Sequence, residues 1–197
     1  TALMSRQAGA RPRARVVGHG RAGGSFADAL ATAGWQVELV AGRGIDHHGD
    51  AAGVDLLLLA VPDGAVAALA ASIEPGDAVT AHVAGSLGFD VLGPHRRRGA
   101  IHPLASLPDR SVGAARLASG ITFSIAGDPL MASLVADLGG RVVELPDGAR
   151  VAYHAAATIA SNHLVGLLGQ VAPVAAGVGL PLSAYPPLVA QTVDNVA

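Results

Sequence analysis

The feature that most constrains this chain is a glycine-rich turn near its start. Arg15–Val17 predicts a short strand, and the sequence Gly-His-Gly-Arg-Ala-Gly follows it at once at positions 18–23. Phe26 and Leu30 then recur at helical spacing, and a second strand is predicted at 35–40. A strand, a glycine turn, a helix and a strand within about 30 residues form the βαβ unit of a parallel sheet. The chain is therefore predicted to begin an α/β fold.

The glycines of this turn fit the G-x-G-x-x-G pattern of dinucleotide-binding proteins, in the strand-to-helix context that the pattern requires. Gly18 permits the tight turn, Gly20 lets a pyrophosphate approach the backbone, and Gly23 lets helix and strand pack closely. The N–H groups at the helix start can then bind phosphate oxygens. A glycine turn without a ligand is the alternative. We assign the whole turn to cofactor binding: Gly18, His19, Gly20, Arg21, Ala22 and Gly23.

The end of the second predicted strand distinguishes NAD from NADP. Proteins that bind NAD place Asp or Glu about 20 residues after the glycines, where the carboxylate binds the ribose hydroxyls. Here that position holds Arg43, whereas Glu38 lies earlier, within the strand. An arginine suits the 2′-phosphate of NADP, with Arg21 as a second contact. We therefore predict NADP, and NAD is the alternative.

The alternation of strands and helices continues to about residue 147. The apolar run Val54–Val61 predicts a central strand covered on both faces. More strands are predicted at 77–83, 100–101, 121–125 and 141–145, and helices at 64–73 and 129–138. The predicted fold is a Rossmann doubly wound, mainly parallel sheet.

Ligands of open parallel sheets bind beyond the carboxyl ends of the strands. Three such ends, at 61–63, 84–86 and 102–103, carry candidate residues. We assign Val61 and Pro62 of the first end, and Gly85 and Ser86 of the second, to the cofactor. His102 also lies at a strand end, and we assign it to the substrate or to proton transfer. His82 lies inside a strand, where a packing role is expected.

After Gly148 the strand pattern gives way to helix, so we place a domain boundary at 146–148. Residues 1–14 are predicted to be a flexible basic tail, 15–147 a dinucleotide-binding Rossmann domain, and 148–197 the start of an all-helical domain. The chain begins without methionine and stops inside an apolar pattern, so we expect a piece of a longer protein. No Asp, Glu or Arg occurs between Arg150 and Asp194. Polar residues interrupt this stretch before the ~20 apolar residues of a membrane span, which favours a helix buried against another subunit or further chain.

The second domain opens with polar residues among alanines. On an α-helix, His154, Thr158, Ser161 and Asn162 share one face. One interpretation is that these groups cap or cross-link helices. The functional hypothesis is a row facing the cofactor, in which His154 transfers a proton and Ser161 and Asn162 orient a carbonyl or imine. No histidine shows metal-ligand spacing with carboxylates, and the pair at 47–48 is predicted to be solvated.

Composition excludes several classes of function. The chain has no cysteine, which rules out disulfides, thiolate metal sites and a cysteine nucleophile. All 13 basic residues are arginine, so a catalytic lysine is impossible. The net charge of -2 argues against nucleic-acid binding, and a chain that is 51% hydrophobic is not intrinsically disordered. We expect a soluble, cytoplasmic protein.

Five segments together carry a family resemblance: VVGHGRAGGSFADAL, DLLLLAVPD, HVAGSLG, AIHPLASL and YHAAATIASNHLVGLL. They resemble Rossmann-like oxidoreductases with a C-terminal helical domain of unknown function, relatives of the pyrroline-carboxylate reductase, ketopantoate reductase and 6-phosphogluconate dehydrogenase superfamily. The resemblance implies an NADP-dependent reductase or dehydrogenase that forms a homodimer through its helical domain, with a chain that continues well beyond Ala197. Several relatives use a lysine of the second-domain helix as proton donor. This chain has none, so His154 is the candidate.

These observations predict hydride transfer between NADPH and a small carbonyl or imine acid. A non-catalytic NADP-binding sensor or scaffold is the alternative, because strong acid–base residues are scarce in the predicted site. Sustained NADPH oxidation with keto acids or cyclic imines would favour the enzyme. A methyltransferase that binds S-adenosylmethionine shares a glycine-rich first loop, but the acidic residue that would hold its ribose is missing.

Overall fold

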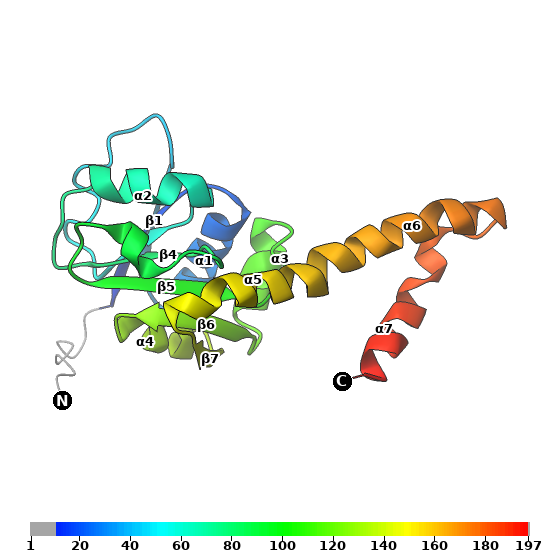
Figure 1. The fold of residues 1–197 in the computed structure, drawn as a ribbon. Coiled ribbons are helices and arrows are strands. Elements are labelled where there is room, and N and C mark those ends of the chain that lie inside the picture. The colour runs from blue at the N-terminus through cyan, green and yellow to red at the C-terminus, as the bar shows by residue number, and fades with distance from the viewer. Residues whose placement is uncertain (1–10, 197) are drawn as a thin grey trace. The chain divides into compact units, whose positions relative to one another are not determined.

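The computed structural model describes residues 11–196 (Figure 1). The strands are β1 Arg13–Val17, β2 Gln36–Val40, β3 Leu56–Leu59, β4 Val79–His82, β5 Arg98–Pro103, β6 Thr122–Gly127 and β7 Arg141–Glu144. The α-helices are α1 Arg21–Thr32, α2 Asp63–Ser72, α3 Arg110–Leu117, α4 Leu130–Asp137, α5 Arg150–Thr158, α6 Leu164–Gly177 and α7 Pro186–Asp194. Shorter turns are the 3-10 segments η1 Phe89–Leu92, η2 Asp147–Ala149 and η4 Leu182–Ala184, and the π-helix η3 Ile159–His163.

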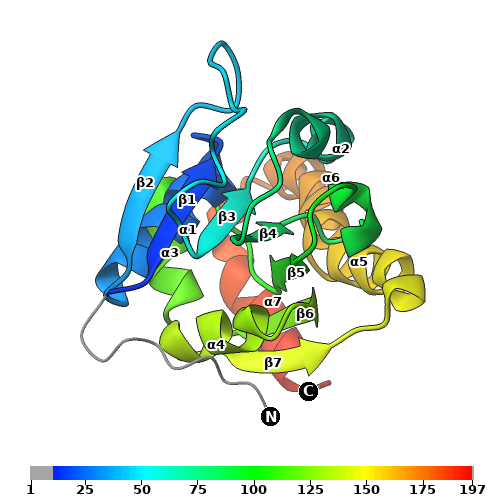
Figure 2. The same cartoon turned by 90° about the vertical axis from the view of Figure 1, so that its left-hand side faces the viewer.

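The seven strands form one sheet in the order β2-β1-β3-β4-β5-β6-β7 (Figure 2). All neighbouring strands are parallel except β5 and β6, which are antiparallel. Strands β2 and β3 lie on opposite sides of β1, so the order of the strands reverses there. Doubly wound sheets bind ligands at such a switch point. The predicted α/β fold is therefore confirmed.

The central strand β3 shows why both faces of the sheet are covered. Alternate side chains of a strand point to opposite faces. Leu56 and Leu58 pack into one core with α1, α3 and α4, and Leu57 and Leu59 pack into a second core with α2 and η1. Four consecutive leucines thus bury both faces, and the sheet lies between two helical layers (Figure 2).

One prediction about the fold is wrong in part, and one helix was missed. Residues 1–10 of the predicted flexible tail lie outside the described residues, but Arg13 and Ala14 belong to β1, and Ala14 is buried because it pairs with both β2 and β3. Helix α3 was not predicted, because it carries few apolar residues and buries only Gly113 and Leu117. Its start is fixed by Asp109, whose side chain accepts a hydrogen bond from the Val112 N–H.

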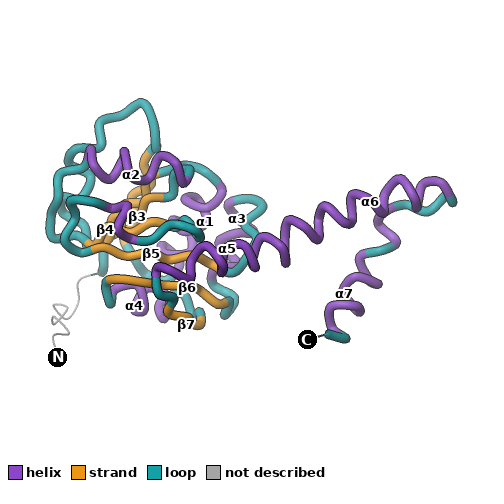
Figure 3. Tube along the Cα trace, viewed as in Figure 1, coloured by secondary structure: helices purple, strands orange, loops and turns teal. Residues whose placement is uncertain are grey.

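The described chain divides into two compact units, between His154 and Ala155. The boundary predicted at 146–148 coincides with the change from strand β7 to helix. Helices α5, η3 and α6 follow one another without interruption from Arg150 to Gly177 (Figure 3). Among the described residues this is the one helix long and apolar enough to cross a membrane, a property that core helices of soluble proteins share.

The second unit buries few of its own side chains. Of the residues from 155 to 196, only Ala175 is buried. Three valines of this unit are largely exposed: Val165 at 67%, Val174 at 74% and Val178 at 71%. This unit contrasts with strand β3, whose four leucines are inaccessible to solvent.

Candidate functional site

The glycine turn, residues 18–23 between β1 and α1, has the geometry that its sequence predicts. Gly18 has φ of +119°, which side chains rarely permit, and a Cβ there would collide with the carbonyl oxygen of Ala60. A Cβ on Gly23 would collide with the carbonyl oxygen of Gly18. A Cβ on Gly20 would meet nothing within 4 Å. The fold therefore requires Gly18 and Gly23, whereas Gly20 faces open space.

The start of α1 is suited to an anion. Gly20 is the N-cap and supplies no side-chain hydrogen bond, and the first turn of the helix holds no acidic residue. The N–H groups of Arg21, Ala22 and Gly23 have no partner within the helix, because the first turn of any α-helix leaves its N–H groups unpaired. These N–H groups and the helix dipole favour phosphate oxygens. The turn thus fits the pyrophosphate of a dinucleotide.

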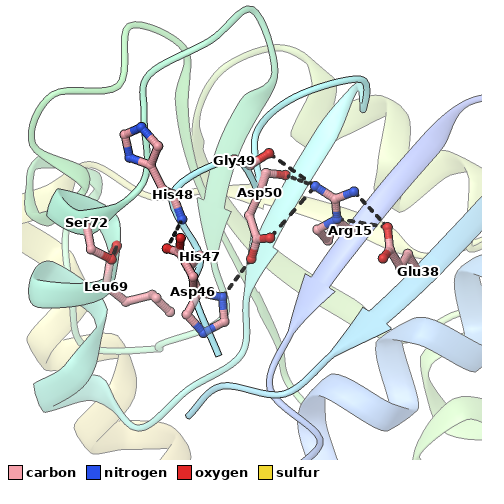
Figure 4. Close-up of polar contacts among 9 residues, drawn as sticks. All are labelled: Arg15, Glu38, Asp46, His47, His48, Gly49, Asp50, Leu69 and Ser72. Atoms are coloured by element: carbon pink, nitrogen blue, oxygen red, sulfur yellow. Dashed lines mark hydrogen bonds and ion pairs between the residues drawn. The ribbon is translucent and has the colours of Figure 1, made fainter. Parts of the chain in front are cut away.

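The end of β2 presents an arginine and no free carboxylate. Glu38 is occupied, because its Oε2 accepts hydrogen bonds from Nε and Nη2 of Arg15 at 2.9 and 2.8 Å (Figure 4). Gly42, just after β2, lies close to the glycine turn. A Cβ on Gly42 would lie 2.9 Å from Cγ1 of Val61 and 3.5 Å from Cα of Gly18. Arg43 follows directly and is exposed. The first charged side chain after β2 is therefore basic.

The loop that carries Arg43, residues 41–55, is tied to the sheet (Figure 4). Nη1 of Arg15 donates to the Asp50 carbonyl oxygen at 2.7 Å, and Nδ1 of His47 lies 2.7 Å from Oδ2 of Asp50. His47 is 7% exposed and His48 is 67% exposed. The predicted solvation is therefore wrong for His47, because the Asp50 carboxylate holds its ring beneath the loop.

The predicted strand-end residues lie along the carboxyl edge of the sheet. Pro62 is the N-cap of α2. Oγ of Ser86, in the loop after β4, donates to Oδ2 of Asp63 at 3.2 Å. His82 is a packing residue as expected: Nδ1 accepts from the Ala84 N–H, and Nε2 lies 3.1 Å from the Gly88 carbonyl oxygen. These contacts shape the loop that holds Gly85.

His102, Tyr153 and His154, here called the histidine cluster, meet beside Gly85. Nδ1 of His102 lies 3.0 Å from the Tyr153 hydroxyl, and the rings of His102 and His154 meet edge to face with centroids 5.6 Å apart. A Cβ on Gly85 would lie 2.9 Å from Nε2 of His102 and would collide with Nδ1 of His154. Two imidazole nitrogens therefore converge on this glycine.

The surroundings of His102 favour the neutral ring. Burial, together with positive charge on His154 and Arg150, lowers the pKa of His102 to about 4, although the Asp63 carboxylate acts in the opposite direction. Nδ1 of His154 is buried and has no hydrogen-bond partner among the described residues. The cluster thus holds a neutral imidazole beside a nitrogen without a partner.

A small cavity of about 100 Å³ connects the glycine turn with the histidine cluster. It is lined by His102 and by residues from the start of α1, the end of β4 and the segment after β5: Ala22, Phe26, Val83, Pro103, Ala105 and Leu107. The two candidate regions therefore border one apolar space within the first unit.

Ser161 and Asn162 lie in the second unit, in the π-helix η3, and both are exposed. The α-helical spacing used to place them on one face with His154 does not apply there, because a π-helix has wider turns. Their role beside His154 stays a prediction. Tyr153 and Asp63 are contacts of the site that the sequence analysis missed, since no motif connects either residue with His102 or Ser86.

Two family models match the chain. Residues 39–108 match a Rossmann-like domain, and residues 118–197 match a domain of unknown function, DUF2520. The chain thus combines a Rossmann-like domain with a C-terminal DUF2520 domain, and the predicted resemblance is confirmed. Among curated proteins no match was found.

Solved structures share the fold. A Bacteroides fragilis protein described as an NADP oxidoreductase is 19% identical with a TM-score of 0.74, and the match covers 94% of this chain and 80% of that one. A Thermotoga maritima protein is 24% identical with a TM-score of 0.71, over 93% and 78% of the two chains. Pyrroline carboxylate reductase from Plasmodium falciparum, with NADP bound, is 14% identical with a TM-score of 0.67, over 94% and 76%. At such identities these structures establish the shared fold.

Proposed function

We propose that this chain, a Rossmann-like domain joined to a DUF2520 domain, is an NADP-dependent oxidoreductase that acts on a small carbonyl or imine acid. The observation that carries the proposal is the contrast within the glycine turn. Gly18 and Gly23 are required by the backbone that surrounds them, whereas the position of Gly20 faces open space at a helix start without a side-chain cap. A turn that served packing alone would not need that third glycine.

The residues present fit NADP. The N–H groups at the start of α1 would hold the pyrophosphate, and Arg43, with Arg21 at the first position of the helix, would bind the 2′-phosphate. The segment at 61–62 and the loop at 85–86 border the same edge of the sheet. When bound, NADPH supplies a hydride. The NADP oxidoreductases among the structural neighbours support this choice of cofactor.

The chain's own residues would supply orientation and a proton. We assign proton transfer to Nδ1 of His154, the buried nitrogen without a partner among the described residues, with His102 as the second candidate. Ser161 and Asn162 would orient the carbonyl or imine of the substrate. The apolar cavity beside His102 would give the apolar part of a small substrate a place to bind.

Calorimetry tests the cofactor. We expect NADPH to bind more tightly than NADH at equal salt. The absence of heat with either dinucleotide on folded protein would overturn the proposal, and a preference for NADH would overturn the role of Arg43.

A substrate screen tests the chemistry. Keto acids and cyclic imines are offered with NADPH, and the absorbance of the reduced cofactor is followed. Sustained turnover with any of them supports the enzyme. Binding without turnover supports the second candidate, a sensor or scaffold.

We also propose that the second unit pairs with a second copy of the chain. Soluble monomers rarely expose apolar surface as extensive as that of Val165, Val174 and Val178. Sedimentation should show a dimer, and Val174→Glu should dissociate it. Gln191→Glu adds the same charge at an exposed polar position of another helix, α7, and is the control. If the unaltered chain sediments as a monomer in buffer without detergent, this proposal is contradicted.

A further inference from the structure

His102 has two distinct ring nitrogens with different surroundings. Nδ1 lies 3.0 Å from the Tyr153 hydroxyl, and the two rings meet edge to face at 89°. Nε2 lies on the side of the ring that faces Gly85, and it has no hydrogen-bond partner among the described residues. The hydrogen of a neutral imidazole resides on one of these nitrogens, and the contact with Tyr153 decides which one.

The chemistry of the two groups favours one direction for this hydrogen bond. A phenol, with a pKa near 10, is a good donor, and the unprotonated nitrogen of an imidazole is a much stronger base than a phenol oxygen. The O–H of Tyr153 therefore donates to Nδ1, and the imidazole hydrogen resides on Nε2. The opposite arrangement would pair the weaker donor with the weaker acceptor.

We propose that Tyr153 is a positioning residue that fixes His102 in its Nε2–H tautomer, so that His102 donates a hydrogen bond from a neutral ring toward the space beside Gly85. Gly85 is part of this device, because a Cβ there would lie 2.9 Å from Nε2. The assignment of the tautomer rests only on contacts within this chain, those of His102 with Tyr153 and with Gly85. The acceptor, the carbonyl or imine of a small acid, rests on the proposed function.

The low pKa of His102 agrees with a donor that stays neutral. His154 and Arg150, both basic, lower this pKa, and Asp63 is the acidic group that acts against them. Because the ring titrates near pH 4, His102 does not change charge near neutral pH.

The tautomer can be measured without any cofactor. Long-range ¹H–¹⁵N spectra of the full chain, labelled at histidine, distinguish Nδ1–H from Nε2–H, and His102→Gln identifies the signals of His102 by their loss. At pH 7 we expect His102 as Nε2–H. In Tyr153→Phe we expect the Nδ1–H form to appear alongside it, whereas Tyr185→Phe, the same change at the other tyrosine, leaves the spectrum unchanged. An Nδ1–H or doubly protonated His102 in the unaltered protein would overturn the proposal.

Turnover tests the consequence of the tautomer. Tyr153→Phe should lower kcat about tenfold and leave the Kd of NADPH within twofold. The glutamine of His102→Gln also presents an N–H donor but has no tautomers. Tyr153→Phe added to His102→Gln should therefore not lower kcat further. An equal tenfold loss in that background would assign Tyr153 another role. If NADPH fails to bind while the Nε2–H form is observed, the proposed function fails and the role of Tyr153 in fixing the tautomer remains.

Discussion

The glycine turn and the histidine cluster lie at the same edge of one sheet, and each depends on a glycine for the opposite reason. At Gly20 a Cβ would meet nothing within 4 Å, so the missing side chain leaves room for something outside the chain. At Gly85 a Cβ would collide with His154, so the missing side chain leaves room for the chain's own imidazoles. A glycine therefore leaves open space beside position 20, whereas the space beside position 85 is occupied by the rings of His102 and His154.

This difference separates effects on folding from effects on function. Gly18 and Gly23 are surrounded by backbone, which has no alternative position, whereas the neighbours of Gly85 are the ends of side chains. Gly20, where a Cβ would meet nothing, should tolerate substitution in the free protein. The substitutions below are chosen to test this distinction.

The largest effect is expected from Gly23→Ala. Its Cβ would collide with the Gly18 carbonyl oxygen, so α1 and β1 must separate, and we expect a loss of about 3 kcal/mol of folding stability. Chemical denaturation measures it. Gly20→Ala is the matched control and should unfold at nearly the unaltered midpoint while binding NADPH more weakly. If Gly23→Ala and Gly20→Ala are equally stable, the proposal that Gly23 serves packing and Gly20 serves ligand access is contradicted.

His154→Gln tests the histidine cluster. We expect turnover to fall about 100-fold, within the usual range for a lost proton-transfer group, while NADPH affinity is retained because the N–H groups proposed to bind the pyrophosphate are unchanged. Steady-state kinetics and calorimetry on the same preparation separate the two quantities. Unchanged turnover would remove His154 from the mechanism.

The pKa of His102 predicts a pH dependence of stability. Above pH 6.5 the ring is neutral in both the folded and the unfolded chain. Between 6.5 and about 4 the unfolded chain takes up a proton that the folded chain does not, so stability decreases as the pH falls and levels off below 4. We expect about 2 kcal/mol from this ring, discounted for its partial exposure.

Denaturation curves at pH 7, 5.5 and 4 measure this contribution of His102. His102→Gln should decline less steeply over this range than the unaltered chain. Parallel declines would show that the ring has an ordinary pKa.

The smallest effect is expected at the edge of the glycine turn. Arg43→Ala would remove the proposed charge-assisted contact with the 2′-phosphate, and we expect NADPH affinity to fall about tenfold, or about 1.4 kcal/mol. NADH affinity should not change, since NADH lacks the 2′-phosphate. An equal loss for both cofactors would place Arg43 elsewhere on the dinucleotide.

The sequence predicted most of the fold because its signals are local. The glycine turn and the four leucines of β3 each determine their own surroundings through backbone freedom or strand alternation. Helix α3 was not predicted because its start depends on one capping side chain, Asp109, and because it buries only two residues, Gly113 and Leu117.

The candidate site was predicted unevenly, for a related reason. Gly85, His102 and His154 were each proposed separately, but only the fold places them together. The contact between His102 and Tyr153 joins residues 51 positions apart, and no pattern in the sequence encodes it. His47 was misjudged because its neighbours in sequence are polar, whereas its burial depends on Asp50 and the anchored loop.

The π-helical turn η3 has a consequence for anything that docks along the second unit. One extra residue in a turn rotates all later side chains by about 100° relative to those before it. The stripe presented by residues 155–158 is thus out of phase with the stripe presented by α6. A straight complementary helix can follow one stripe or the other but not both, so a binding surface that spans the junction must itself bend or change faces there.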